Sequence, residues 1–314
     1  MRVYFKLLLL GSFVAALGLM TTGCAKSSTA PDDTDNPVIH SLEFGHTTSH
    51  SDYCAQMNLS DDFGNGFLFS IWTKITQTIE PGGTRGNMNI LRIYGDNWGL
   101  ICLDGNIGQN ADGTARYNAN FMLDLNSTYI GDFCTYYSLP TENISMDDAN
   151  GWVWVAWQVV VNADKSMTLR QWLKFGVDGI VIPAGYWNDT DVPGEEILIA
   201  GTTSVEGWNI PDTFDPSKPR SFRIGDDNTW SGVNTPSNSY LYHARLYART
   251  TKPTINELNA IALATFADTG AWGDWMLEWK DGAADLTDES GHGNDLSLQP
   301  GGILYMGAQA PNLP

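Results

Sequence analysis

Positive charge is scarce in this chain, and this scarcity restricts the partners that the protein can bind. The 314 residues include 17 Lys and Arg against 36 Asp and Glu, so the net charge is −19 at pH 7. A surface this acidic repels the phosphate backbone of nucleic acids and the charged groups of acidic polysaccharides. We therefore expect no nucleic-acid partner, and the charge favours a neutral ligand.

Cysteine is also scarce, with four residues in the whole chain. Cys24 lies in the N-terminal segment, which leaves Cys54, Cys102 and Cys134. Three is an odd number, so these residues form no disulfide framework, although one bridge among them stays open. Buried free thiols are the simpler interpretation, and the spacing matches no zinc pattern.

The sequence has no apolar run of about 20 residues after the N-terminal segment. A run of that length is needed for a helix to span a membrane. In that segment, two basic residues precede an apolar run at 7–20, and Thr-Thr-Gly-Cys ends at Cys24. This is the three-part layout of a secretory signal. The Gly-Cys junction resembles the lipobox of bacterial lipoproteins, although Thr21 stands where such boxes mostly carry Leu. The resemblance implies cleavage after residues 1–23 and acylation of Cys24, with an ordinary signal peptide as the alternative.

The segment 24–37 lacks apolar bulk, and we expect it to be a disordered tether. Residues 38–314 are expected to form a single domain, since all-β sandwiches often use 200–250 residues as one domain. With a lipid on Cys24, the tether holds this domain off a membrane. We therefore expect a membrane-anchored bacterial lipoprotein, located at the outer membrane or the cell surface.

The run at 151–161 is β-branched and aromatic and has the length of a strand. Both of its alternating faces are largely apolar, which predicts a strand covered on both sides, as in the centre of a two-sheet sandwich. A polar link at 162–166 has the Asn, Asp and Ser of a tight turn. A second run at 167–176 then predicts the return strand of a long antiparallel hairpin.

Similar runs predict further strands, and one pattern predicts a helix. A capping box at 254–257 and an apolar stripe from Ile255 to Phe266 indicate one helix over 254–266. The Gly- and Asn-rich segment 104–113 is predicted to be a loop, and 126–150 to be mostly irregular. The other strands are expected at 38–44, 66–75, 89–94, 99–103, 117–125, 179–183, 222–225, 239–248, 275–279 and 296–298.

Several short motifs resemble the laminin-G-like branch of the concanavalin A-like jelly-roll superfamily, and together they cover most of 38–298. They are Phe-Ser-Ile-Trp at 69–72, Trp-Val-Ala at 154–156, Phe-Arg-Ile-Gly at 222–225, Ala-Arg-Leu-Tyr at 244–247 with Ile-Asn-Glu-Leu at 255–258, and Asp-Glu-Ser-Gly-His-Gly-Asn at 288–294.

The resemblance implies an all-β fold, a two-sheet antiparallel jelly-roll sandwich with one concave sheet and, here, one short helix near the C-terminal part. Two departures stand out. The 288–294 turn mostly lies near the start of such domains and here comes last, and Trp172 and Lys174 stand where a short exposed strand is usual. Function is not implied, because the superfamily includes lectins, carbohydrate-binding modules, glycosidases, lyases and adhesive domains.

Catalytic signatures are missing from the sequence. A retaining glycosidase needs two carboxylates about 5.5 Å apart, carried in this superfamily as E-x-D-x-x-E, and no such array occurs. Glu195 and Glu196 are adjacent and would point to opposite faces of a strand. Only the segment 240–245 has residue types like those of a lyase site, which needs His, Tyr and Arg. Alternation places His243 and Arg245 on one face of this strand and the tyrosines on the other. An ordinary outer strand is the simpler interpretation, so the sequence leans against an enzyme.

A binding module requires less, since one stacking ring and a few amides can hold a sugar. Tryptophans in loop contexts are therefore candidate ligand-binding residues, although each can instead be a lid over the core. Asp226 and Asn228 would supply hydrogen bonds beside Trp230, the preferred candidate. The loop candidates, in order of preference, are Trp230, Trp98, Trp208 and Trp187. The tryptophans expected in the core are Trp72, Trp154, Trp157 and Trp172.

For a bound cation, calcium at Asp288 and Asn294 is the leading candidate. Asp226, Asp227 and Asn228 come second. Both groups have an alternative role, because Asp and Asn side chains commonly cap turns.

Together these patterns predict a cell-surface lipoprotein that binds a neutral glycan as an accessory of polysaccharide use. A glycoside hydrolase or polysaccharide lyase on the same fold is one alternative, and a protein-binding adhesive domain is another. A glycan array combined with a reducing-sugar assay would separate the three.

The substitution Cys24→Ser is expected to abolish incorporation of labelled palmitate and to release the protein from membranes, because acylation requires this thiol. Metabolic labelling followed by membrane fractionation measures both effects, with Cys54→Ser as the matched control that keeps the label. Labelling that persists in Cys24→Ser would contradict the lipoprotein prediction.

Overall fold

The described residues of this computed structural model lie in the compact unit Val38–Pro314. They are 38–44, 55–59, 66–75, 86–95, 99–109, 115–125, 128–138, 151–164, 166–183, 196–199, 220–225, 239–265, 270–298 and 303–314.

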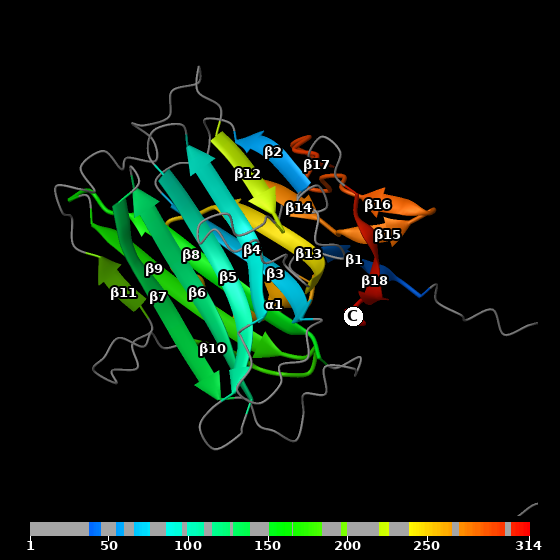
Figure 1. The fold of residues 1–314 in the computed structure, drawn as a ribbon, viewed down its shortest axis with the longest axis horizontal. Coiled ribbons are helices and arrows are strands. Elements are labelled where there is room, and N and C mark those ends of the chain that lie inside the picture. The colour runs from blue at the N-terminus through cyan, green and yellow to red at the C-terminus, as the bar shows by residue number, and fades with distance from the viewer. Residues whose placement is uncertain are drawn as a thin grey trace, which may run out of the picture. The chain divides into compact units, whose positions relative to one another are not determined.

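Antiparallel strands dominate the described residues, together with one short helix, α1 (Ile255–Ala262) (Figure 1). The all-β prediction is confirmed. Within the described ranges, no helix is long and apolar enough to cross a membrane.

The strands form two sheets. The large sheet has eleven described strands, and its main path is β10 (Val181–Pro183), β9 (Met167–Phe175), β8 (Val153–Val161), β3 (Gly66–Ile75), β13 (Ser239–Ala248), β1 (His40–Phe44), β15 (Glu278–Lys280) and β16 (Ala283–Asp285). Off this path, β11 (Glu196–Ile199) pairs with β9, β14 (Gly273–Trp275) with β13, and β18 (Tyr305–Gln309) with β1.

The small sheet has seven described strands, and the last four form a continuous meander. Its order is β17 (Ser297–Leu298), β2 (Ala55–Leu59), β12 (Arg220–Ile224), β4 (Gly86–Gly95), β5 (Gly99–Gln109), β6 (Ala115–Leu125) and β7 (Thr128–Ser138). Each sheet therefore combines segments from distant parts of the chain.

The predicted central hairpin is confirmed as β8 and β9, which pair from Val153 to Val161 without a break. Its turn is held by short-range polar contacts. The backbone N–H of Asn162 donates to the carbonyl of Ser166 at 2.8 Å. The Asp164 carboxylate accepts the Ser166 N–H at 3.0 Å and its hydroxyl at 2.6 Å. The polar link thus closes the turn through its own side chains.

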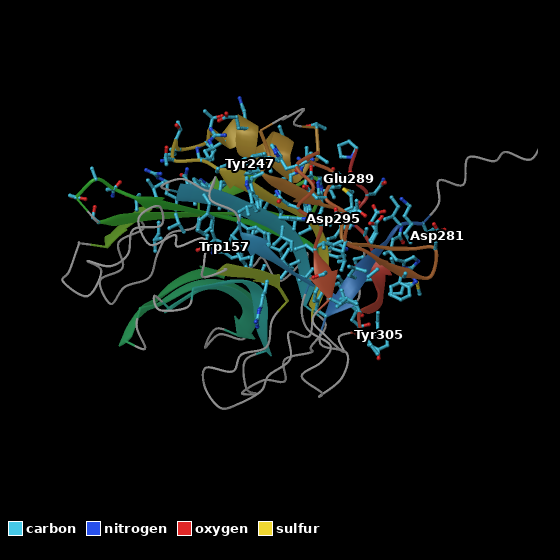
Figure 2. The ribbon with its side chains drawn as sticks, turned by 90° about the horizontal axis from the view of Figure 1, so that it is seen from above. Trp157, Tyr247, Asp281, Glu289, Asp295 and Tyr305 are labelled. Carbon is cyan, nitrogen blue, oxygen red and sulfur yellow. The ribbon has the colours of Figure 1, made fainter. Side chains whose placement is uncertain are left out.

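One face of the large sheet packs on the small sheet. Trp157 stacks on Phe69 with ring centroids 6.3 Å apart, and Phe69 meets Phe222 of β12 edge-on at 6.1 Å. Figure 2 shows Trp157 between the sheets and Tyr247 on the side of the helix. Gly225 closes the contact, because a Cβ there would lie 2.1 Å from the Phe44 ring.

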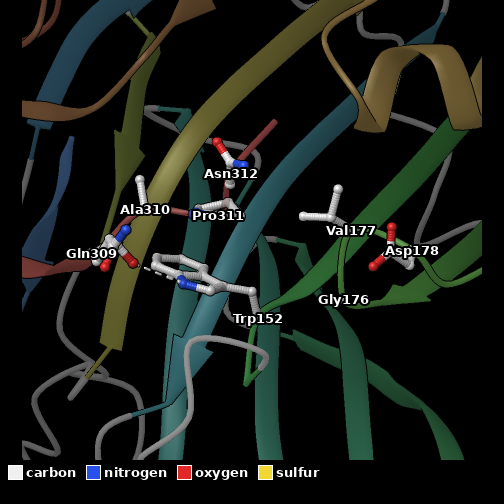
Figure 3. A pocket seen from close by; sticks show the side chains of 8 residues that line it. All are labelled: Trp152, Gly176, Val177, Asp178, Gln309, Ala310, Pro311 and Asn312. Carbon is white, nitrogen blue, oxygen red and sulfur yellow. Dashed lines mark hydrogen bonds between the residues drawn. The ribbon is translucent and has the colours of Figure 1, made fainter. Parts of the chain in front are cut away.

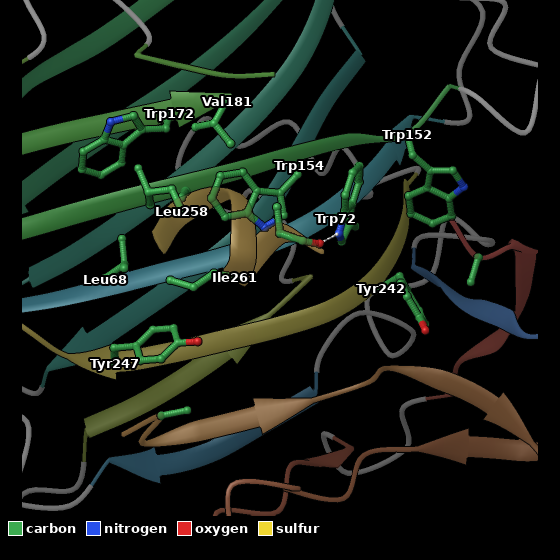
Figure 4. Packing of buried hydrophobic residues seen from close by; sticks show 14 residues of the cluster. Leu68, Trp72, Trp152, Trp154, Trp172, Val181, Tyr242, Tyr247, Leu258 and Ile261 are labelled. Carbon is green, nitrogen blue, oxygen red and sulfur yellow. Dashed lines mark hydrogen bonds between the residues drawn. The ribbon is translucent and has the colours of Figure 1, made fainter. Parts of the chain in front are cut away.

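The other face of the large sheet is covered by α1, whose Leu258, Ile261 and Ala262 join a buried cluster rich in tryptophan (Figure 4). The indole N–H of Trp72 donates to the carbonyl of Ala262 at 2.8 Å and ties the helix to the sheet. Both faces of β8 are therefore covered, as predicted. The predicted core residues Trp72, Trp154, Trp157 and Trp172 are each 1% exposed.

The helix begins at the predicted capping box. The side chain of Thr254 accepts the Glu257 N–H, and the Glu257 carboxylate accepts the Thr254 N–H. The helix ends at Ala262, short of the predicted limit of 266, and Phe266 lies outside the described residues. Ile255 is 44% exposed, so placing it on the buried stripe was wrong.

Strands β2, β16 and β18 were not predicted, several strand ends differ by two or three residues, and three longer stretches differ from the prediction. The expected loop at 104–113 is strand as far as Gln109, and the expected irregular region at 126–150 contains β7. Asn and Gly are depleted in strands, which hid β5, but pairing with β6 along its length outweighs that local preference. The run expected at 275–279 is divided between β14 and β15, because Leu277 has a left-handed φ of 56°.

Candidate functional site

The small sheet has one apolar and one polar face, and β12 identifies them. Phe222 and Ile224 are fully buried, and Phe222 packs on Phe69 and Trp275 of the large sheet. Arg223, between them in the strand, belongs to the opposite face because successive residues alternate. It is only partly buried.

Cross-strand partners share a face, so the register extends this division to β7. The rows that contain Ile224 and Phe222 are apolar throughout. They are Ile224, Leu91, Leu103, Phe121 and Phe133, and Phe222, Ile93, Ile101 and Leu123.

The opposite rows make up what we call the polar face. They are Asn58, Ser221, Tyr94, Leu100 and Asp124; Gln56, Arg223, Arg92, Cys102, Met122 and Asp132; Asn89, Asp104, Asn120 and Cys134; and Asn87, Asn106, Asn118 and Tyr136.

The composition of the polar face is unusual for β-strands. Asn and Asp, both depleted in strands, supply nine residues of these rows, whereas Lys, Glu and Thr are absent from them. An amide both donates and accepts hydrogen bonds, as a sugar hydroxyl does. The polar face is therefore a candidate site for a hydroxyl-rich ligand.

One row of the polar face concentrates positive charge in an acidic protein. Arg223 lies directly across from Arg92 in the ladder between β12 and β4. Like charges in this position are destabilising. Asp104 is the nearest acidic residue by register, two positions along β5 from Cys102, the partner of Arg92.

The residues that the sequence singled out for ligand binding lie outside the described residues. These are Trp230, Trp98, Trp208, Trp187, Asp226 and Asn228, and Cys24 is outside them too. Their roles stay predictions. The polar face was missed from the sequence because its rows join residues from six strands, and only the register shows that they share one face.

The turn at 288–294 is described, and the Asp288 carboxylate is its centre. One oxygen accepts the N–H groups of Asp274 and Ser290 at 2.9 and 3.0 Å. The other accepts the Ser290 hydroxyl at 2.7 Å and the Asn294 N–H at 2.9 Å. Burial raises the pKa of Asp288, but these donors outweigh it and hold the pKa below its usual value.

Asn294 belongs to the same turn and anchors it to the large sheet. Its side-chain N–H donates to the carbonyl of Trp272 at 2.6 Å, and its own carbonyl accepts the indole N–H of Trp275 at 2.8 Å. Both residues therefore have a turn-capping role. Calcium at this turn stays a prediction, and a cation there would have to displace donors from Asp288.

The strand considered for a lyase site contains a β-bulge. Tyr242 pairs with Trp72 and Arg245 with Ser70, so three residues of β13 advance while β3 advances by two. Tyr242 and Arg245 therefore share a face, and the expected strict alternation was wrong. His243 sits in the bulge with a left-handed φ of 47°, a strained conformation for a non-glycine residue.

The bulge is held by a buried cluster of charges. His243 Nε2 lies 2.9 Å from one oxygen of Asp274, and Arg245 Nε lies 2.9 Å from the other. The side chain of His243 is 2% exposed, which leaves no access for a substrate. Burial raises the pKa of Asp274, but His243 and Arg245 outweigh it and hold the pKa below its usual value. The cluster thus joins β13 to β14.

No protein-family model matches the chain. No curated protein matches it either.

Solved structures give weak matches. The chain is similar to scytalido-glutamic peptidase with a peptide-based transition-state analog, with a TM-score of 0.28, 11% identity, and coverage of 82% of this chain and 97% of the other. It is also similar to two mutant forms of alginate lyase Aly36B, in complex with alginate tetrasaccharide and trisaccharide. The TM-scores are 0.23 and 0.24, and the sequence identities are 11% and 12%. Each match covers 61% of this chain, and the matches cover 77% and 78% of the respective lyase chains. Scores of this size carry no argument about topology or chemistry, so the jelly-roll resemblance stays a hypothesis.

The substitution Asp274→Asn is expected to lower the free energy of unfolding by about 3 kcal/mol at neutral pH, because it leaves the buried Arg245 guanidinium without its carboxylate partner. The folded-state pKa of Asp274 is depressed, so its contribution is present above the unfolded pKa and is lost as pH falls through the folded pKa. Urea unfolding should therefore show the difference from the parent shrinking below about pH 4. The control Asp281→Asn lies in an exposed turn. Equal stability of parent and Asp274→Asn at pH 7 would count against this account.

The substitution Asp288→Asn is expected to cost about 2 kcal/mol, because a neutral amide replaces an acceptor of four hydrogen bonds. Thermal unfolding in EDTA and in calcium separates the two roles of the turn. A cost that is equal in both conditions indicates turn capping alone. A rise in Tm with calcium that occurs in the parent and is absent in Asp288→Asn supports the predicted cation.

Proposed function

We propose that this chain is a glycan-binding module and that the polar face of its small sheet holds the glycan. The supporting observation is the concentration of Asn and Asp on one face of six adjacent strands, against an apolar opposite face. Local strand preference opposes these residue types. A ligand that pairs with amides and carboxylates explains their presence, and sugar hydroxyls are such a ligand.

The dimensions of the face suit a chain rather than a single ring. Strands lie about 4.8 Å apart, so six strands span roughly 24 Å. That width accommodates several linked sugars in a row. Amides spaced along and across the strands would bond successive hydroxyls, which favours an extended glycan.

The loop tryptophans complete the proposal. Trp98 lies in the segment that joins β4 to β5, and Trp230 follows shortly after β12. Both strands belong to the small sheet. Stacking of a ring on a sugar adds roughly 0.5–1.5 kcal/mol beyond area burial. The tryptophans would therefore supply apolar contacts that the polar face lacks.

Two observations indicate different charges for the ligand. A net charge of −19 favours a neutral glycan, as the sequence predicts. Arg92 pairs with Arg223 in the ladder between β4 and β12, which adds positive charge on this face. We propose a mostly neutral glycan. The salt dependence of binding distinguishes the cases, since only a charged contact is screened.

A second candidate function is glycoside hydrolysis on the same face. Asp132 pairs with Met122, two residues from Asp124 on the neighbouring strand. In a regular ladder the backbone positions of such a diagonal pair lie roughly 7–8 Å apart, and a bulge between Leu123 and Asp124 alters that spacing here. Inverting glycosidases hold their two carboxyl groups ~6.5–9.5 Å apart. This pair joins two strands and therefore escapes a search for a one-strand array. Release of reducing sugar that stops in Asp132→Asn would support it.

The cellular setting is part of the proposal. With Cys24 acylated and residues 24–37 as a tether, the module would be displayed from a membrane, at the outer membrane or cell surface. There it would hold polysaccharide for neighbouring degrading enzymes. The adhesive alternative differs in its ligand, which would be a protein.

The double substitution Asn118→Ala with Asn120→Ala is expected to weaken glycan binding roughly 30-fold. Each lost hydrogen bond contributes about 1 kcal/mol, and ~1.4 kcal/mol is tenfold. Calorimetry against the strongest ligand from a glycan array, at low and high salt, measures the effect. Asp281→Asn is the control and should bind like the parent.

The same calorimetry is applied to the Trp→Ala variants at 230, 98, 208 and 187. Loss of one important ring should weaken glycan binding about tenfold. Parent-like binding by the folded double Asn variant would remove the polar face from the proposal. An array with no glycan ligand would remove the function itself. Binding that falls steeply with salt would identify an acidic glycan.

A further inference from the structure

A pocket of about 230 Å³ lies beside the large sheet, away from the polar face (Figure 3). Three segments line it: the start of β8 at Trp152, the turn after β9 at Gly176–Asp178, and the C-terminal stretch from Gln309 to Asn312. None of its residues belongs to the small sheet.

Hydrogen bonds join the three segments, so the pocket is formed before any ligand arrives. The carbonyl of Trp152 accepts the Gly176 N–H at 2.9 Å. The indole N–H of Trp152 donates to the carbonyl of Gln309 at 3.1 Å, as Figure 3 shows. The N–H of Ala310 donates to the carbonyl of Ile39 in turn, at 2.9 Å. A preformed pocket avoids the cost of ordering its walls upon binding.

The turn that carries Asp178 is held by a hydrogen bond from a buried lysine, Lys174. Lys174 is 1% exposed and donates to the carbonyl of Gly179 and, at 3.0 Å, to the side-chain oxygen of Asn259 in α1. Burial lowers the pKa of Lys174, and the nearby charge of Asp178 partly offsets this. Lys174 thus supports the turn that carries Asp178, whose side chain is exposed at the pocket rim.

The lining combines an apolar wall with a polar rim. Ala310 and Pro311 are buried, and Trp152 is 1% exposed, so a ligand meets only a small part of the indole. Asp178, Gln309 and Asn312 are exposed at the rim. The residues that line the pocket include one carboxylate, two side-chain amides and no Lys or Arg. Such a rim bonds hydroxyl groups and repels anions.

We propose that this pocket is a second carbohydrate site that binds a single free neutral sugar ring. Its volume is below the ~300–1,000 Å³ of pockets for larger ligands, which limits the occupant to about one ring. The carboxylate and amides bond hydroxyls, and the wall of Ala310 and Pro311 packs on the C–H face. The small exposed area of Trp152 limits stacking, so the affinity is low, in the millimolar range.

The test is saturation-transfer difference NMR of the folded protein with D-glucose, D-galactose, D-mannose and D-xylose, each followed by titration. At least one sugar should bind, and Asn312→Ala or Asp178→Asn should weaken its binding at least tenfold. Two variants are used because Asp178 also neighbours Lys174, whereas the Asn312 side chain makes no hydrogen bond within the described part of the chain. Asp281→Asn, in an exposed turn, is the control and should leave binding unchanged.

The outcomes separate this site from the polar face. Asn118→Ala with Asn120→Ala should leave monosaccharide binding intact, and Asn312→Ala should leave binding of the extended glycan intact. The proposal is overturned if no sugar of the panel binds, or if binding survives both pocket variants. Binding of tetramethylammonium in place of every neutral sugar would show a cation site and would also overturn it.

Discussion

Burial of both faces of the large sheet is the constraint on which the rest of the structure depends. On one face Trp157 and Phe69 pack against Phe222 of the small sheet. On the other, Trp72 and its neighbours pack under α1. Fully buried side chains of this kind contribute about 1.5–3 kcal/mol each. The small sheet needs only one face for this packing, which leaves its polar face for another use.

Burial on both sides places strict demands on polar groups in the large sheet. Gln158 meets them by donating to the carbonyls of Arg249 and Thr251 and accepting from Arg170. Lys174 donates hydrogen bonds to the carbonyl of Gly179 and to the side-chain oxygen of Asn259. Within the described residues, Ser70 Oγ and Trp157 Nε1 have no hydrogen-bond partner. Such orphaned groups cost about 1–3 kcal/mol each, which the surrounding aromatic packing offsets.

The two candidate glycan sites differ in how the chain builds them. The polar face is spread over β2, β12, β4, β5, β6 and β7. Its position depends on register, so a slip of one residue would exchange it with the apolar face. The pocket depends on a few contacts among Trp152, Gly176 and Gln309. A broad shallow face suits an extended chain, and a small closed pocket suits one ring. A module with both would hold a glycan chain and a single sugar on separate surfaces.

The hairpin of β8 and β9, the capping box at Thr254 and the burial of Trp72 and Trp172 could be predicted from the sequence, because period, turn chemistry and caps act over a few residues. The bulge at His243, the extent of β5 and the presence of β7 could not, since pairing with distant strands outweighed local preference there. The polar face likewise required the tertiary structure. Asn58, Asn89, Asn106 and Asn120 are unremarkable one at a time, and only cross-strand register, which no local pattern encodes, brings them onto one surface.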